Sequence, residues 1–126
     1  MFVKDAELVV GIVGRMGVDT KRVCGWVSEA LHVLRYQSRR IKITDYFAMH
    51  AISDVELRDE TVESRYDSYI SACNAMREKS GRNDFFVSFA IQSIIETRKE
   101  ITGDDTGLMP AQRTAYVIDQ LKRPEE

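Results

Sequence analysis

The feature that most constrains the fold is an apolar run that ends at a glycine and is followed at once by a helical pattern. Residues 7–13 (Glu-Leu-Val-Val-Gly-Ile-Val) form this run, and Gly14, Gly17 and Asp19 lie in the segment after it. Glycine tolerates a left-handed backbone and lets a ligand approach the chain closely. The first amides of a helix point outward and attract anions. This order of strand, loop and helix is typical of a phosphate-binding loop.

The loop departs from the strict pattern G-x-x-x-x-G-K-[ST]. Counted from Gly14, the positions of the second glycine, the lysine and the hydroxyl hold Asp19, Thr20 and Lys21. Arg15 or Lys21 can supply positive charge, although neither stands at the expected offset. Asp19 repels a phosphate if it faces the loop and is favourable as an N-cap of the next helix. Phosphate binding by a degenerate Walker A loop and simple tight packing at a turn therefore both stay open.

Composition excludes several classes of function. The chain has 126 residues, of which 44% are hydrophobic and 30% charged, with a net charge of −2. This balance argues against general nucleic-acid binding, and the cluster Arg39-Arg40 with Lys42 is typical of a solvated strand edge. No apolar run approaches a membrane span, and no signal-peptide pattern is present. The two isolated cysteines, Cys24 and Cys73, indicate a reduced, cytoplasmic protein without a zinc site.

Periodicity predicts alternating strands and helices. The first run is nearly continuous, which predicts a strand buried on both faces of a parallel sheet. Gly81 and Gly103 each follow a helical pattern and predict helix ends. Residues 45–58 fit a short helix or a loop. The expected strands are 7–13, 37–44 and 113–121, and the expected helices are 19–36, 60–79 and 83 or 84–102.

Three assignments concern helix faces. In the first helix, Trp26 is expected in the core and His32 on the surface. Arg98 and Lys99 lie among mixed charges that fit a solvated face. The last helix opens with a broad apolar face that predicts core packing. The expected stripe of the first helix is Val23, Trp26, Val27, Ala30, Leu31 and Leu34, and the apolar face of the last begins with Phe85, Phe86 and Phe89.

These elements predict an α/β, P-loop-like, three-layer fold with a small parallel sheet. The whole chain, residues 1–126, forms one nucleotide-binding domain in this interpretation, and residues 45–102 form a helical insertion. Three strands make a small sheet, and an apolar sheet edge must be covered or paired. We therefore expect the domain to be incomplete, as part of a longer protein or of an assembly.

A second motif lies at the end of the third expected strand. Tyr116-Val-Ile-Asp119 is an apolar run that ends in a carboxylate. If the first and third strands are neighbours, Asp119 lies near the glycine loop, where such an aspartate holds Mg²⁺ in phosphate-loop proteins. A turn residue at a strand end is the alternative. Arg77 and Arg82 bracket the turn between two helices and fit either phosphate contacts or a solvated surface.

The segments Glu7–Asp19, Ser71–Arg82 and Ala115–Glu126 resemble the bacterial anti-phage deoxycytidine-nucleotide (dCTP/dCMP) deaminases. In that family this region is an N-terminal phosphate-loop domain that resembles nucleotide kinases, and a zinc cytidine-deaminase domain follows it. The family removes deoxycytidine nucleotides during phage infection. The residues that the resemblance implicates are Gly14, Gly17, Asp19 and Thr20 in the loop, Asn74, Arg77, Gly81 and Arg82 at the helical turn, and Asp119.

The sequence lacks the residues that zinc-dependent deamination requires. A zinc deaminase needs the signature H-x-E…P-C-x-x-C. Here Val33-Leu34 follow His32, and Ala51-Ile52 follow His50. We therefore expect a module that binds a (deoxy)nucleotide phosphate at residues 14–21, with Mg²⁺ as a candidate cofactor, and regulates a deaminase.

Two alternatives remain. The chain is a small kinase-like phosphotransferase that uses Arg15 or Lys21 as its cation, or it is an interaction module with Phe85, Phe86 and Phe89 as a partner face. The absent loop lysine leaves enzymatic activity undecided. The expected partners are a nucleotide and either further copies of the chain or a deaminase domain.

Overall fold

A computed structural model describes residues 5–15, 17–43, 60–82 and 84–121. The described residues form three strands and three helices, which confirms the predicted α/β class. Residues 45–58, for which a helix or a loop was expected, lie outside them. The elements are β1 (Leu8–Ile12), α1 (Thr20–Val33), β2 (Gln37–Lys42), α3 (Val62–Ser80), α4 (Val87–Thr102) and β3 (Thr114–Asp119).

The sheet is parallel, and its last strand in sequence lies at its centre. The strand order is β1-β3-β2, so the predicted neighbourhood of the first and third strands is confirmed. All six residues of β3 are buried. In the register of the sheet, Asp119 lies opposite both Ile12 of β1 and Lys42 of β2. The carboxyl ends of all three strands therefore meet at one edge, around Asp119.

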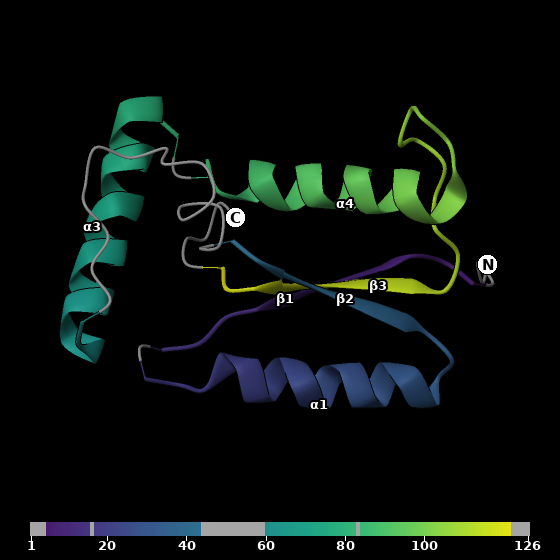
Figure 1. The fold of residues 1–126 in the computed structure, drawn as a ribbon, viewed down its shortest axis with the longest axis horizontal. Coiled ribbons are helices and arrows are strands. Elements are labelled where there is room, and N and C mark those ends of the chain that lie inside the picture. The colour runs from purple at the N-terminus through teal and green to yellow at the C-terminus, as the bar shows by residue number, and fades with distance from the viewer. Residues whose placement is uncertain (1–4, 16, 44–59, 83, 122–126) are drawn as a thin grey trace.

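The helices cover the two faces of this sheet. In Figure 1, α1 and α4 lie on opposite sides of the strands, and α3 stands beyond their carboxyl ends. Alternation along β3 divides the core between the two sides. Ala115 and Val117 pack with Cys24 and Leu31 of α1. The other side gathers Ile41, Ile43, Ala72, Phe86, Ala90, Tyr116 and Ile118, with Phe85 and Phe89 packed against them.

The helix ends predicted at Asp19, Gly81 and Gly103 are confirmed. Asp19 caps α1 through a hydrogen bond from the Arg22 amide to its carboxylate, 3.1 Å long. Thr61 and Ser64 form a reciprocal capping box at the start of α3. Gly81 and Gly103 end α3 and α4 in the left-handed conformation. The last helix begins at Val87, a few residues later than the predicted start, because residues 84–86 form a turn instead.

Two predictions of burial are wrong. Trp26 was expected in the core, but it is 57% exposed, and Arg22 lies 5.2 Å above the centre of its ring. The first strand was expected to be buried on both faces, but Val9 is 60% exposed because β1 is an edge strand. The buried face of α1 is centred on Cys24 and Leu31, so Leu34 and Ala30 also lie outside it.

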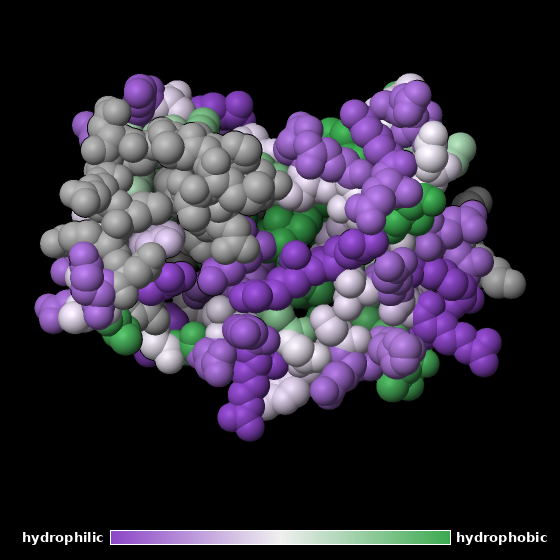
Figure 2. Space-filling view, viewed as in Figure 1, coloured by the Kyte–Doolittle hydropathy of each residue, from purple (hydrophilic) through white to green (hydrophobic). Residues whose placement is uncertain are grey.

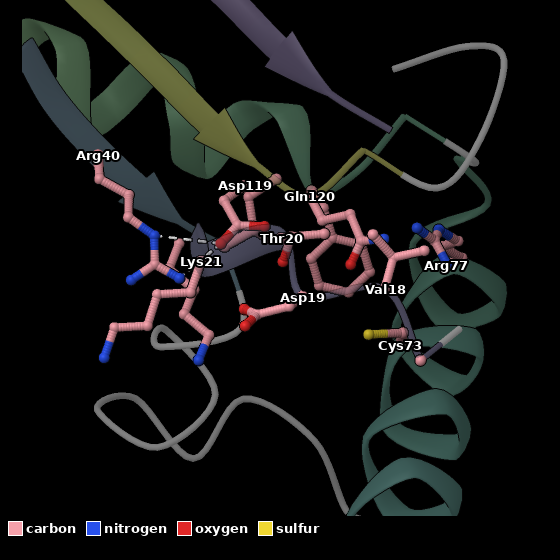
Figure 3. A pocket seen from close by; sticks show the side chains of 13 residues that line it. Val18, Asp19, Thr20, Lys21, Arg40, Cys73, Arg77, Asp119 and Gln120 are labelled. Carbon is pink, nitrogen blue, oxygen red and sulfur yellow. Dashed lines mark hydrogen bonds and ion pairs between the residues drawn. The ribbon is translucent and has the colours of Figure 1, made fainter. Parts of the chain in front are cut away.

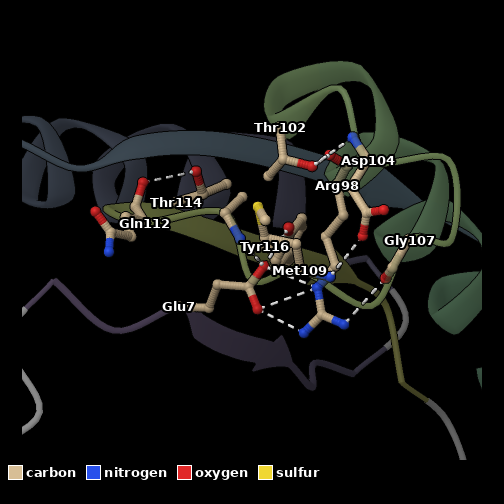
Figure 4. A network of polar contacts seen from close by, with 10 residues as sticks. Glu7, Arg98, Thr102, Asp104, Gly107, Met109, Gln112, Thr114 and Tyr116 are labelled. Carbon is tan, nitrogen blue, oxygen red and sulfur yellow. Dashed lines mark hydrogen bonds and ion pairs between the residues drawn. The ribbon is translucent and has the colours of Figure 1, made fainter.

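A largely buried carboxylate links the start of β1 to α4 and to the loop before β3 (Figure 4). Glu7 accepts hydrogen bonds from Tyr116 Oη at 2.7 Å and from the Ala111 amide at 3.1 Å. Arg98 donates to it through Nη2 and Nε. The expectation of a solvated face for Arg98 is therefore wrong, because its side chain is largely buried in this ion pair.

The surface agrees with the composition. Viewed as in Figure 1, hydrophobic residues appear as separate groups among hydrophilic ones (Figure 2). Within the described ranges, no helix has the length and apolar character needed to span a membrane.

Candidate functional site

A pocket lies at the edge where the carboxyl ends of the strands meet. Its volume is about 450 Å³, within the range of ligand-binding clefts. The wall is formed by the loop before α1 and the start of α1, by the ends of β2 and β3, and by the α3–α4 region. The lining residues are Gly17, Val18, Asp19, Thr20, Lys21, Arg40, Lys42, Ile43, Cys73, Arg77, Phe86, Asp119 and Gln120. This is the edge of an open parallel sheet at which ligands generally bind.

Six of the predicted site residues come together in this pocket (Figure 3). They belong to the loop, to the first turn of α1, to the end of α3 and to the end of β3. The six are Gly17, Asp19, Thr20, Lys21, Arg77 and Asp119.

Three other predicted residues lie outside the pocket lining. Gly14 contributes its carbonyl oxygen to a hydrogen bond from Gln120 Nε2, 2.7 Å long, so its part is to hold the loop against β3. Arg15 is exposed. Arg82 forms a two-pronged ion pair with Asp84 on the surface, with N–O distances of 2.8 and 2.7 Å. For Arg82, the structure therefore favours the solvated-surface interpretation.

The loop is a tight turn rather than a wide cradle. The Val18 amide donates to the Arg15 carbonyl at 3.2 Å, and Gly17 has a φ of 89°, which favours glycine. A Cβ on Gly17 would meet no atom within 4 Å. Gly17 is therefore needed for the backbone of the turn and not for space.

The start of α1 is partly occupied by its own cap. Asp19 accepts from the Arg22 amide, one of the donors that a phosphate at a helix N-terminus would use. Its carboxylate also places negative charge at the pocket. Any anion in this site therefore competes with Asp19 for the helix amides and must be held by side chains as well.

An ion pair between two strands lies at the floor of the pocket. Arg40 of β2 donates from Nε at 3.1 Å and from Nη2 at 2.5 Å to the same Oδ2 of Asp119. Asp119 is 3% exposed, whereas the side chain of Arg40 is 33% exposed. Burial lowers the pKa of Arg40, but the hydrogen bond and charge of Asp119 raise it overall. Arg40 therefore stays charged and compensates a buried carboxylate.

Cys24 lies beneath this pair on the α1 side of the sheet. Burial is the main cause of its raised pKa, and the negative charge of Asp119 adds to it. The thiol is therefore held in its neutral form, as expected of a packing cysteine.

Arg77 approaches from the other side of the pocket. It is buried on α3, and its guanidinium carbon lies 4.9 Å above the centre of the Phe86 ring. Cys73, one turn earlier on α3, also lines the pocket. The cation–π contact positions a charged fork against an aromatic wall.

The lining residues carry an excess of positive charge. Four are cationic, namely Lys21, Arg40, Lys42 and Arg77, and two are anionic, namely Asp19 and Asp119, so the described lining has a net charge of plus two. Cations that converge from separate elements on a concave site favour a bound anion. Phosphate is well matched to arginine forks.

Arg40, Lys42 and Gln120 line the pocket but were not predicted as site residues from the sequence. A signal for the first two was present, because residues two apart on a strand share a face and the end of a parallel strand lies at the ligand edge. The basic cluster was instead interpreted as a solvated strand edge. For Gln120, only its position directly after Asp119 pointed to the site.

The Mg²⁺ prediction for Asp119 remains a prediction. Among the residues that the structure describes, no three His, Cys, Asp or Glu side chains gather into a metal-binding group. Asp119 is present at the predicted place, but Arg40 engages its Oδ2.

Known proteins give no further guide to the identity of the chain. No family model, curated protein or solved structure matches it.

Proposed function

We propose that this domain binds a (deoxy)nucleotide through its phosphate and acts as a nucleotide-sensing module in a deaminase-type anti-phage defence system. The observation that carries the proposal is the convergence of four cationic side chains on one pocket at the carboxyl edge of the sheet. Residues 17–19 of the loop and the start of α1 form one side of that pocket. The resemblance to deoxycytidine-nucleotide deaminases supplies the ligand class and the biological role.

The domain is proposed to bind the nucleotide without deaminating it. The sequence lacks the zinc signature of cytidine deaminases, so a deaminase domain or partner would carry out that reaction. Nucleotide occupancy in the pocket would then report the nucleotide pool to that domain.

Thermal unfolding against a panel of ribo- and deoxynucleotides, with and without Mg²⁺, tests nucleotide binding. A ligand at a hundredfold excess over its Kd is expected to stabilise the folded chain by about 2.7 kcal/mol. Gly17→Val should abolish this stabilisation, because it distorts the turn that leads into α1. Gly103→Val is the matched control, since Gly103 has a similar φ of 73° and equal space around it but lies outside the pocket lining. Equal responses of the two variants, or no response to any nucleotide, would refute the proposal.

A further inference from the structure

The missing loop lysine leaves open which cation would hold the phosphate, and the ion pair between β2 and β3 suggests an answer. In the strict phosphate loop, a lysine within the loop contacts the phosphates. Thr20 stands at that position here. Arg40 comes instead from β2, which β3 separates from β1, and it reaches the same pocket.

The geometry of Arg40 suits a receptor for an anion. Its side chain is fixed by Asp119, which accepts from Nε and Nη2 on one oxygen. A guanidinium has five N–H donors, and Asp119 takes two of them. The side chain is one-third exposed at the pocket, so it can donate to a ligand without leaving its partner. A pre-positioned cation loses less side-chain entropy on binding than a free one.

Other cations lie around Arg40 in a definite arrangement. Lys42 follows it by two residues on β2 and lies on the same face of the sheet. Figure 3 shows Arg40 and Lys21 on one side of the pocket and Arg77 on the other, with Asp19 and Asp119 between them. A compact anion bound against Arg40 would therefore have Lys21 on its own side of the pocket, whereas Arg77 lies across the pocket, beyond Asp19 and Asp119.

We propose that Arg40, held in place by Asp119, is the phosphate-binding cation of this domain and that the site takes a phosphomonoester dianion without a divalent metal ion. This inference rests on the proposed function, because it concerns the same pocket. Asp119 acts as a positioning residue for Arg40, which engages one of its two carboxylate oxygens, Oδ2. The net charge of the described lining, plus two, matches a dianion such as a nucleoside monophosphate.

The test is calorimetric titration of the whole chain with inorganic phosphate and with deoxycytidine monophosphate, once in EDTA and once in Mg²⁺. Both ligands are expected to bind in EDTA, with affinities within about twofold of those in Mg²⁺. Arg40→Ala should weaken binding at least about tenfold, and Arg40→Lys should restore part of it. Arg39→Ala is the matched control, because Arg39 lies on the opposite face of β2, where it pairs with Glu100 of α4 at 3.5 Å.

A double variant controls for two other causes of weaker binding, namely unfolding of the domain and a change in the net charge of the pocket. Arg40→Ala leaves the carboxylate of Asp119 buried without its partner, which can unfold the domain. The double variant Arg40→Gln, Asp119→Asn removes one charge of each sign, so the net charge of the pocket lining stays the same. It should still lose at least about tenfold in phosphate affinity, since the guanidinium is gone.

The outcomes separate this inference from the proposed function. Binding that requires Mg²⁺, or a double variant that binds phosphate as tightly as the wild type, overturns the role of Arg40 and leaves the nucleotide site intact. A folded chain that binds neither ligand under either condition overturns this inference, and it overturns the proposed function as well if no nucleotide of the thermal-unfolding panel stabilises the chain.

Discussion

Glu7 couples its own ionisation to the folding of three separate parts of the chain. Burial alone raises its pKa, but hydrogen bonds from Arg98, Tyr116 and the Ala111 amide, together with the charge of Arg98, lower the pKa overall. A carboxyl whose pKa is lower in the folded state stabilises the protein fully above its unfolded pKa, about 4.3. That stabilisation is lost as the pH falls through the folded pKa.

Glu7→Gln should therefore reduce the amount of unfolding free energy that the protein loses as the pH falls. At neutral pH the substitution is expected to cost about 1–3 kcal/mol, because Arg98 and Tyr116 lose a charged acceptor. As the pH falls from the unfolded pKa of Glu7 through its lower folded pKa, the two proteins should converge. Urea unfolding across this pH range measures both effects, with the exposed Glu29→Gln as control. Curves that stay parallel down to the lowest pH would contradict the prediction.

The same contact shifts the pKa of Tyr116 in the opposite direction. Burial first, and then its hydrogen bond to Glu7, raise the pKa of Tyr116 to about 12. A phenol with a raised pKa stabilises the fold below its unfolded pKa and loses that contribution as the pH rises toward 12. The network therefore limits stability at both ends of the pH range.

The sequence did not predict the distant ion-pair partners of single residues. Arg98 pairs with Glu7 across 91 residues of sequence, and Arg40 pairs with Asp119 across 79. Local charge patterns carry no information on such distant partners. Both arginines were therefore assigned to a solvated surface, and only the three-dimensional fold shows their carboxylate partners.

At the scale of the element, α1 shows what periodicity can and cannot predict. Its start at an N-cap was predicted correctly, but of the expected apolar stripe only Leu31 is buried, and Trp26 and Leu34 are exposed. Periodicity gives the direction of a stripe but not the width of the sheet beneath it. Here the helix packs on β2 and β3, so the part of the stripe that includes Trp26 and Leu34 remains exposed.

Truncation of Leu31 and of Trp26 in α1 should therefore lower the free energy of unfolding by different amounts. Leu31 is 7% exposed, and Leu31→Ala is expected to destabilise the fold by about 2–5 kcal/mol through loss of packing and a residual cavity. Trp26→Ala removes a larger side chain but should cost only about 0.5–1 kcal/mol, chiefly its contact with Arg22. Chemical denaturation of both variants measures the difference. A larger cost for Trp26→Ala would restore the core position that its sequence pattern suggested.

The cap of α1 allows stability and anion affinity to be separated. Asp19→Asn keeps a capping oxygen and removes a negative charge from the pocket, so stability should change by only a few tenths of a kcal/mol while phosphate binds more tightly. Asp19→Ala removes both, and should cost about 1 kcal/mol of stability. Thermal unfolding and phosphate titration of the two variants test this. Weaker phosphate binding by Asp19→Asn would show that the carboxylate assists the ligand.

For the molecule as a whole, the sequence predicted the parallel sheet and the edge at which its strands end. Alternating strands and helices specified parallel pairing, and parallel pairing places every strand's carboxyl end at the same edge. This is why Asp119 could be placed near the glycine loop. The approach of α3 to that edge could not be predicted, because nothing local determines how a helix docks beyond a sheet.

The two edges of the sheet differ in a way that bears on assembly. The outer strand β2 carries Arg39, Arg40 and Lys42, and charged side chains protect an edge against pairing. The opposite edge, β1, reads Leu-Val-Val-Gly-Ile without a charge, and its Val9 is largely exposed. We therefore expect β1 to be the edge through which the domain associates with another strand.

Val9→Lys should weaken this association. A lysine on an edge strand places a charge that must stay hydrated where a partner strand would pack. If the wild-type chain self-associates through β1, the concentration at which its mass rises should increase at least about tenfold in the variant, a change of about 1.4 kcal/mol. Size-exclusion chromatography with light scattering over a concentration series measures it. Val62→Lys is the matched control, because Val62 is also an exposed valine but begins α3, away from the sheet edge. Unchanged association of Val9→Lys, or an equal loss in Val62→Lys, would show that β1 is not the contact, and the apolar flank of α1 with Trp26 and Leu34 would then be the next surface to substitute.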